Sequence, residues 1–235
     1  MDEQPKKETF KDRVLNTIVD CSKQYQTTYV EQDHLIVSEA FKKNPYYIIE
    51  ANGDNYLHLT GVSTSLSAAD FYDKCIDGSL TADDFDLVTH NKSEKESKGV
   101  IRQKIRNLPL ISSTIDDGCL VQEDFRRNSV LCTFASSAGK CTLGFIASPT
   151  NVRPKSLLNG SVVDAESSSP LKIRLTRARG EDKFSTLSVG TLDDLASHYN
   201  ELKDMLSDDL IAKIESHLEQ KSSDKIGRAS CRERV

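Results

Sequence analysis

The sequence contains no tryptophan and no apolar run that approaches the length of a bilayer-spanning helix. Such a helix needs about 20 mainly apolar residues, so we expect no membrane partner. The polar first residues lead into no apolar segment, which argues against a secretory signal. The six cysteines form no CxxC pair and show no cysteine–histidine spacing typical of zinc. These absences predict a cytoplasmic protein with reduced thiols, in which a free-thiol core is favoured over a Cys132–Cys141 disulfide.

The motifs of several enzyme classes are also missing. The chain has no GxxxxGK[ST], GxGxxG, HExxH or EF-hand pattern, so no metal or cofactor is expected. Aspartates cluster at 83–86, beside a short helical start expected at 81–85, and at 208–209, where a helix would start after the possible break. At helix starts they suit the helix dipole better than a metal. Cys75 and Cys141 each have an adjacent lysine, but this neighbour alone is weak support for a nucleophilic thiol.

Charge is distributed unevenly along this acidic chain, whose net charge is −5. Residues 1–118 carry net −6 and residues 181–225 also carry net −6, whereas residues 119–180 have nine basic and four acidic side chains. A basic middle in an acidic protein is what a local anion-binding surface requires. Part of it, the alternating strand predicted at 172–179, could equally be an ordinary solvated face, so contact between its outward Lys172 and Arg174 and a substrate stays open.

The periodicity predicts one α+β domain. Helices are expected at 9–29, 67–77, 100–108 and 191–220, the last either continuous or a hairpin broken near 207–209. Strands are expected at 34–40, 46–51, 119–125, 130–135, 141–147 and 172–179, with 153–158 as a loop or turn. The predicted domain arrangement is a disordered segment at 1–8, one domain at 9–180 and an acidic helical extension at 181–225.

The segment Asn55–Gly61 reads as the end of a strand, because Leu57 and Leu59 alternate with polar side chains. His58 and Thr60 would then share the open face. The pair could serve acid–base chemistry, although His58 could equally be an ordinary edge histidine. Metal-free RNA cleavage needs a base, an acid and cations at the phosphate, and His58, Thr60, Arg153, Lys155 and Ser156 could supply these if their segments meet.

Three stretches carry a resemblance to a known family. They are Tyr46–Glu50 with Asn55–Val62, the helix Ser67–Cys75, and the Arg153–Asn159 turn. Together they resemble the phage-associated branch of the barnase–EndoU–colicin–RelE-like nuclease superfamily, in its fourth subgroup, over roughly residues 25–180. The resemblance implies helices packed on a mainly antiparallel sheet of about four strands, here followed by a C-terminal amphipathic helix.

The resemblance also implies a metal-independent ribonuclease of a mobile element. His58 and Thr60 match one conserved pair, and Lys155 and Ser156 match the second motif. RNA, with tRNA as one candidate, is the implied partner, and an inhibitor or antitoxin-like protein is a further candidate. Two alternatives stay open: a catalytically inactive RNA-binding module, and an interaction protein that uses the 191–220 helix.

The last ten residues, 226–235, break with the preceding pattern. They contain three arginines and an odd cysteine, show no helical period and resemble a translated sequencing adapter. We therefore expect the natural sequence to depart from this one near Lys225, and these residues are left out of the fold and function predictions.

Overall fold

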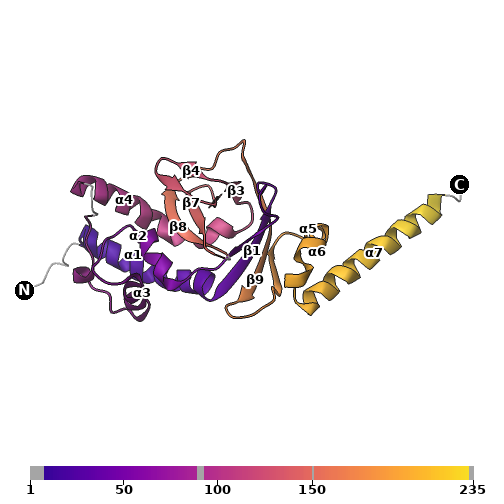
Figure 1. The fold of residues 1–235 in the computed structure, drawn as a ribbon, viewed down its shortest axis with the longest axis horizontal. Coiled ribbons are helices and arrows are strands. Elements are labelled where there is room, and N and C mark those ends of the chain that lie inside the picture. The colour runs from indigo at the N-terminus through magenta and orange to yellow at the C-terminus, as the bar shows by residue number, and fades with distance from the viewer. Residues whose placement is uncertain (1–7, 89–92, 150, 233–235) are drawn as a thin grey trace, which may run out of the picture.

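The computed structural model describes residues 8–88, 93–149 and 151–232, with side chains placed as far as residue 221 (Figure 1). Apart from Glu8, the segment predicted to be disordered lies outside these ranges. The side chains of the adapter-like residues 226–235 lie outside them as well. Within the described ranges, no helix combines the length and the apolar character needed to cross a bilayer.

Helices form two groups at opposite sides of a sheet (Figure 1). The first group is α1 (Phe10–Tyr25), α2 (Tyr56–Thr60), α3 (Ala68–Asp77) and α4 (Glu94–Asn107). The second group is α5 (Leu192–Ser197), α6 (Tyr199–Leu202) and α7 (Asp208–Arg232), and α7 projects away from the body (Figure 1). Ser67 caps α3, because its side chain accepts a hydrogen bond from the Asp70 amide. The chain breaks before α7, so the hairpin alternative for 191–220 holds.

The prediction of a sheet of about four strands is wrong. In the described residues, seven strands close into a mixed barrel in the order β1-β2-β8-β7-β6-β3-β9, and β9 pairs back with β1. An eighth strand, β10, adds to β9, and β4 and β5 form a separate ribbon. The barrel strands are β1 (Gln32–Ser38), β2 (Tyr47–Ile49), β3 (Leu120–Glu123), β6 (Phe134–Ser137), β7 (Cys141–Ala147), β8 (Val152–Asn159) and β9 (Ser168–Ala178). Outside the barrel lie β10 (Thr186–Val189), β4 (Arg126–Arg127) and β5 (Val130–Leu131).

The number four came from the family resemblance, and two features of the barrel also escaped the strand prediction. Residues 152–159 form β8 rather than a turn, because Pro154 sits at a bulge where its missing N–H is tolerated. In addition, β1 has partners on both edges, β2 and β9, which a hairpin-by-hairpin sequence interpretation cannot foresee.

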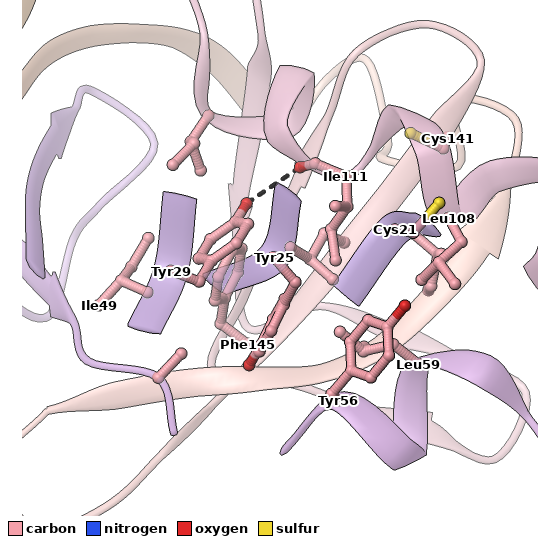
Figure 2. Close-up of a cluster of buried hydrophobic side chains, with 14 of the residues drawn as sticks. Cys21, Tyr25, Tyr29, Ile49, Tyr56, Leu59, Leu108, Ile111, Cys141 and Phe145 are labelled. Atoms are coloured by element: carbon pink, nitrogen blue, oxygen red, sulfur yellow. Dashed lines mark hydrogen bonds between the residues drawn. The ribbon is translucent and has the colours of Figure 1, made fainter. Parts of the chain in front are cut away.

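The barrel and the first helix group share one hydrophobic core. Its members come from α1, from the inner faces of the strands and from α2 (Figure 2). Tyr25, Tyr29 and Tyr56 are fully buried there, and the Tyr29 hydroxyl donates a 3.0 Å hydrogen bond to the Ile111 carbonyl. A second core lies on the outer side of β1 and β9, where Leu35 and Leu175 pack with Leu210 and Ile214 of α7. Because both faces of β1 are covered, its apolar residues Leu35, Ile36 and Val37 are consecutive instead of alternating with polar ones.

His34 on β1 is buried inside this fold. Its Nε2 lies 2.6 Å from the Thr28 carbonyl, and its Nδ1 has no partner among the described residues. Burial lowers the pKa of His34 to about 4, since the imidazolium form would lose its hydration, and the Arg174 guanidinium acts in the same direction. The Thr28 hydrogen bond opposes this shift only in part.

We expect the folded state to lose stability as the pH falls from about 6.5 to about 4. In that window the unfolded chain binds a proton at His34 that the native state does not, a difference worth roughly 3 kcal/mol. Urea unfolding at pH 7 and pH 4.5 measures the loss. The His34→Gln variant should show a flatter pH dependence, and equal slopes for the two proteins would contradict the assignment.

Candidate active site

The segment predicted to end a strand at His58 is instead a short helix, α2. Tyr56, Leu59 and Thr60 are buried at helical spacing, and Figure 2 shows Tyr56 and Leu59 within the core. The Tyr56 hydroxyl donates a 2.6 Å hydrogen bond to the Ile18 carbonyl of α1. His58 lies on the opposite, exposed side of the helix. The strand prediction failed because five residues are too few to separate a period of 2 from one of 3.6.

The position of α2 follows from the short strand before it. β2 contributes only Ile49 to a parallel pairing with Val152 of β8, and the Glu50 amide adds one hydrogen bond of 3.0 Å to the Val152 carbonyl. Beyond this point the chain leaves the sheet through a 3-10 turn, Gly53–Asn55, in which Asn52 and Asn55 cap each other. The rest of the β8 edge is therefore left for α2 to approach.

A bulge in β8 determines which side chains face this approach. Pairing with β7 runs from Phe145–Pro154 directly to Gly144–Ser156, so Lys155 has no cross-strand partner. Arg153 and Lys155 are both exposed, while Pro154 between them is buried. The edge of β8 next to α2 therefore carries two cations in three residues.

His58 and these cations line one surface pocket of about 460 Å³. Its other lining residues come from the turn before α2, the start of α3, α4 and β7. The complete lining is Asp54, Asn55, His58, Ala68, Lys104, Ile146, Arg153, Pro154 and Lys155. The pocket thus combines one imidazole with three cationic side chains and one carboxylate. Such a set can move a proton and stabilise an anion.

Lys104 of α4 is a lining residue that the sequence interpretation did not identify. Its ammonium donates a hydrogen bond to the backbone carbonyl of His58, one of the carbonyls left open at the end of α2. The aliphatic part of its side chain lies over Gly61. The predicted helix at 100–108 places Lys104 on a polar face, but no sequence signal links it to a partner 46 residues away.

Other predicted site residues lie elsewhere. Thr60 is buried and its hydroxyl donates a 2.8 Å hydrogen bond to the Leu57 carbonyl, so it does not line the pocket. Ser156 also lies outside the lining. On β9, Lys172 is 3.7 Å from a Glu39 carboxylate oxygen and Arg174 is 3.1 Å from Asp116. The structure therefore unites His58, Arg153 and Lys155 but not Thr60, Ser156, Lys172 or Arg174.

Two further arginines of β9 and its end fix the chain that leads into the site. Arg177 donates to both Asp33 and Glu50, each at 3.1 Å. Arg179 donates to Asp33 at 2.7 Å, and also to the Ala51 carbonyl and the Asn52 side chain. These contacts anchor the residues just before the turn that carries Asp54 and Asn55. Arg177 and Arg179 therefore have a structural role here.

The described cysteines offer no activated thiol. Cys21, Cys75, Cys119, Cys132 and Cys141 are all free and buried. Burial raises the pKa of Cys75 to about 12 and that of Cys141 to about 11. A thiol that stays protonated at neutral pH is a poor nucleophile. The sequence likewise gave only weak support for a nucleophilic role of Cys75 or Cys141.

We expect Gly61→Ala to destabilise the protein more than Gly78→Ala. Both glycines end helices with positive φ, 80° and 77°, so alanine costs about 1–2 kcal/mol at each from backbone strain. A Cβ at Gly61 would also lie 2.7 Å from the Lys104 Cδ, and moving that side chain disturbs its hydrogen bond to the His58 carbonyl, whereas Gly78 is open. Urea unfolding measures both costs. In a Lys104→Ala background, Gly61→Ala and Gly78→Ala should destabilise the protein by similar amounts. If Gly61→Ala still costs as much more than Gly78→Ala, the contact with Lys104 is refuted.

Comparison with known proteins places most of this site within one family. The model of the family described as phage-Barnase-EndoU-ColicinE5/D-RelE like nuclease 4 matches residues 17–150. The match contains α2 with His58, Lys104 and all of β7, and it ends three residues before Arg153. No curated protein and no solved structure matches the chain. Since the family model covers more than half of the sequence, the chain belongs to the phage-Barnase-EndoU-ColicinE5/D-RelE like nuclease 4 family.

Proposed function

We propose that this nuclease is a metal-independent endoribonuclease of a mobile element, with its chemistry in the His58 pocket. The observation that supports this most is the presence of one exposed imidazole beside Lys104, Arg153 and Lys155 in a single pocket. Imidazole and fixed cations are the groups that phosphodiester cleavage by the 2′-hydroxyl requires. Membership of a nuclease family is consistent with this chemistry.

The proposed reaction transfers the phosphorus from the 5′-oxygen to the neighbouring 2′-oxygen. The 2′-hydroxyl oxygen attacks phosphorus as its proton passes to a base, and the bond to the 5′-oxygen breaks as that oxygen receives a proton. His58 is proposed as the acid or base, because an imidazole can take either role near neutral pH. Arg153 and Lys155 stabilise the extra negative charge on the pentacoordinate phosphorus. The products are a 2′,3′-cyclic phosphate and a 5′-hydroxyl.

One observation favours a second candidate, a catalytically inactive RNA-binding module. His58 is the single histidine in the lining described above, and Asp54 is the single carboxylate there. Thr60 and Ser156, which the sequence suggested as catalytic partners, do not face the pocket. A binding module would retain RNA affinity without cleaving it.

His58→Ala should abolish RNA cleavage and leave the fold intact, since His58 is exposed on a helix surface. The measurement uses end-labelled total tRNA and a generic single-stranded RNA with EDTA present, and analyses the product ends. EDTA should not alter the rate of the parent protein. His217→Ala on α7 is the matched control and should cleave normally. Folded parent protein that binds RNA but cleaves neither substrate would favour the binding module.

Lys155→Ala should lower the cleavage rate by about 10²-fold or more if its ammonium stabilises the transition state. Lys140→Ala is a suitable control, because Lys140 is also exposed and does not line the pocket. Single-turnover rates with saturating protein separate this effect from substrate binding. A loss confined to binding, with an unchanged single-turnover rate, would argue against a role for Lys155 in the chemical step.

A further inference from the structure

The cations of the basic middle region, residues 119–180, fall into two sets. Those on β9 and at its end are all compensated. Lys172, Arg174, Arg177 and Arg179 each lie within 4 Å of a carboxylate oxygen of Glu39, Asp116 or Asp33. The others make no ion pair with any residue in the described part of the chain. They are Arg126, Arg127, Lys140, Arg153 and Lys155. The uncompensated charge of this region is thus concentrated away from β9.

Two of these uncompensated cations, Arg126 and Arg127, form the strand β4 of a small ribbon. β4 pairs with β5 through Arg126–Leu131 and Arg127–Val130, and Asn128 turns between the strands with a φ of 50°. Asparagine adopts this left-handed conformation more readily than most other residues. Both arginines are exposed, and Leu131 opposite Arg126 is 54% exposed. The ribbon therefore presents two guanidinium groups and an apolar side chain to solvent.

The ribbon is held firmly on its inner side. Phe125 and Cys132 at its base are buried in a small core with Ala135, and Val130 packs against the same core. The Cys132 amide donates a 2.9 Å hydrogen bond to the Phe125 carbonyl. Because the base of the ribbon is anchored, the two arginines have a defined place on the surface.

The ribbon also lies directly beside the His58 pocket. Lys155, which lines that pocket, donates a 3.1 Å hydrogen bond from its ammonium to the Leu131 carbonyl of β5. Leu158 of β8 packs into the same small core as Val130. A strand edge that contributes Arg153 and Lys155 to the pocket thus continues into contact with the ribbon.

We propose that the β4–β5 ribbon is a second phosphate-binding element, which holds the backbone of single-stranded RNA next to the pocket where the chain is cleaved. Arg126 and Arg127 bind phosphates flanking the scissile one, because a guanidinium offers paired donors that match phosphate oxygens. Leu131, opposite Arg126, gives a base an apolar surface beside that arginine. This inference rests on the proposed function, since it extends the substrate of the same site.

Binding is measured in a His58→Ala background, so that RNA is not consumed. The probe is a labelled single-stranded RNA of mixed sequence, titrated at several salt concentrations. The Arg126→Gln/Arg127→Gln variant should weaken binding and reduce the slope of log affinity against log salt by about 1.4, because each phosphate contact with a single strand contributes about 0.7. Arg126→Lys/Arg127→Lys should retain most of the slope.

A control with the same change in net charge is Lys140→Gln/Lys203→Gln, both exposed positions outside the ribbon and the pocket. Its slope should match that of the parent. An equal fall in the control, or no fall in the ribbon variant, would overturn the proposal. Absence of salt-dependent RNA binding by the parent would overturn it as well.

Cleavage by proteins that retain His58 separates this proposal from the proposed function. A dinucleoside monophosphate has only the scissile phosphate, so Arg126→Gln/Arg127→Gln should cleave it at the parent rate. The kcat/KM of the same variant on a longer RNA should fall by about tenfold, the loss expected for charge-assisted contacts to phosphate. Equal losses on both substrates would contradict a flanking-phosphate role. RNA binding that depends on the ribbon without any cleavage would refute the nuclease mechanism and leave the ribbon proposal standing.

Discussion

The antiparallel pairing of β1 with β9 is the contact on which the rest of the structure depends. It joins Gln32–Ser38 to residues 171–178 and turns an open sheet into a barrel. Closure has two consequences for the site. It supplies the arginines at the end of β9 that fix Asp33, Glu50 and the chain before α2. It also places the short strand β2, which contributes only Ile49 to its pairing with β8, within the ring, and the edge of β8 carrying Arg153 is open to α2.

The family match and the fold do not have the same extent. The family model ends at residue 150, whereas β8 and β9 follow it and are needed to complete the barrel. The pocket is divided in the same way, with His58 and Lys104 inside the match and Arg153 and Lys155 beyond it. The groups proposed to transfer protons and those proposed to stabilise charge therefore come from different parts of the chain, which only the closed barrel brings together.

Local features were predictable from the sequence where a short-range cause decides them. Helix α3 lies close to the predicted 67–77, β7 coincides with the predicted 141–147, and β1 lies two residues before the predicted 34–40. Barrel closure was not predictable, because the β1–β9 contact depends on partners far apart in sequence. His58 and Lys155 line one pocket, a proximity that their spacing in the sequence could not show, and α2 was taken for a strand, which placed Thr60 on the wrong face. The sequence showed the excess of positive charge in residues 119–180. It could not show which of these cations are compensated, because that depends on the ion pairs that β9 makes in the fold.

Barrel closure also constrains how this chain can reach its native state. Asp33 and Arg177, which meet across the closing pair, are 144 residues apart. Forming a contact between residues so far apart in sequence costs chain entropy before the contact can stabilise the fold. Folds dominated by such pairings therefore form slowly. During synthesis β1 emerges early and must wait for β9 with one edge unpaired and with Leu35 and Val37 uncovered. The nascent protein is therefore most prone to aggregation until the ribosome has released β9.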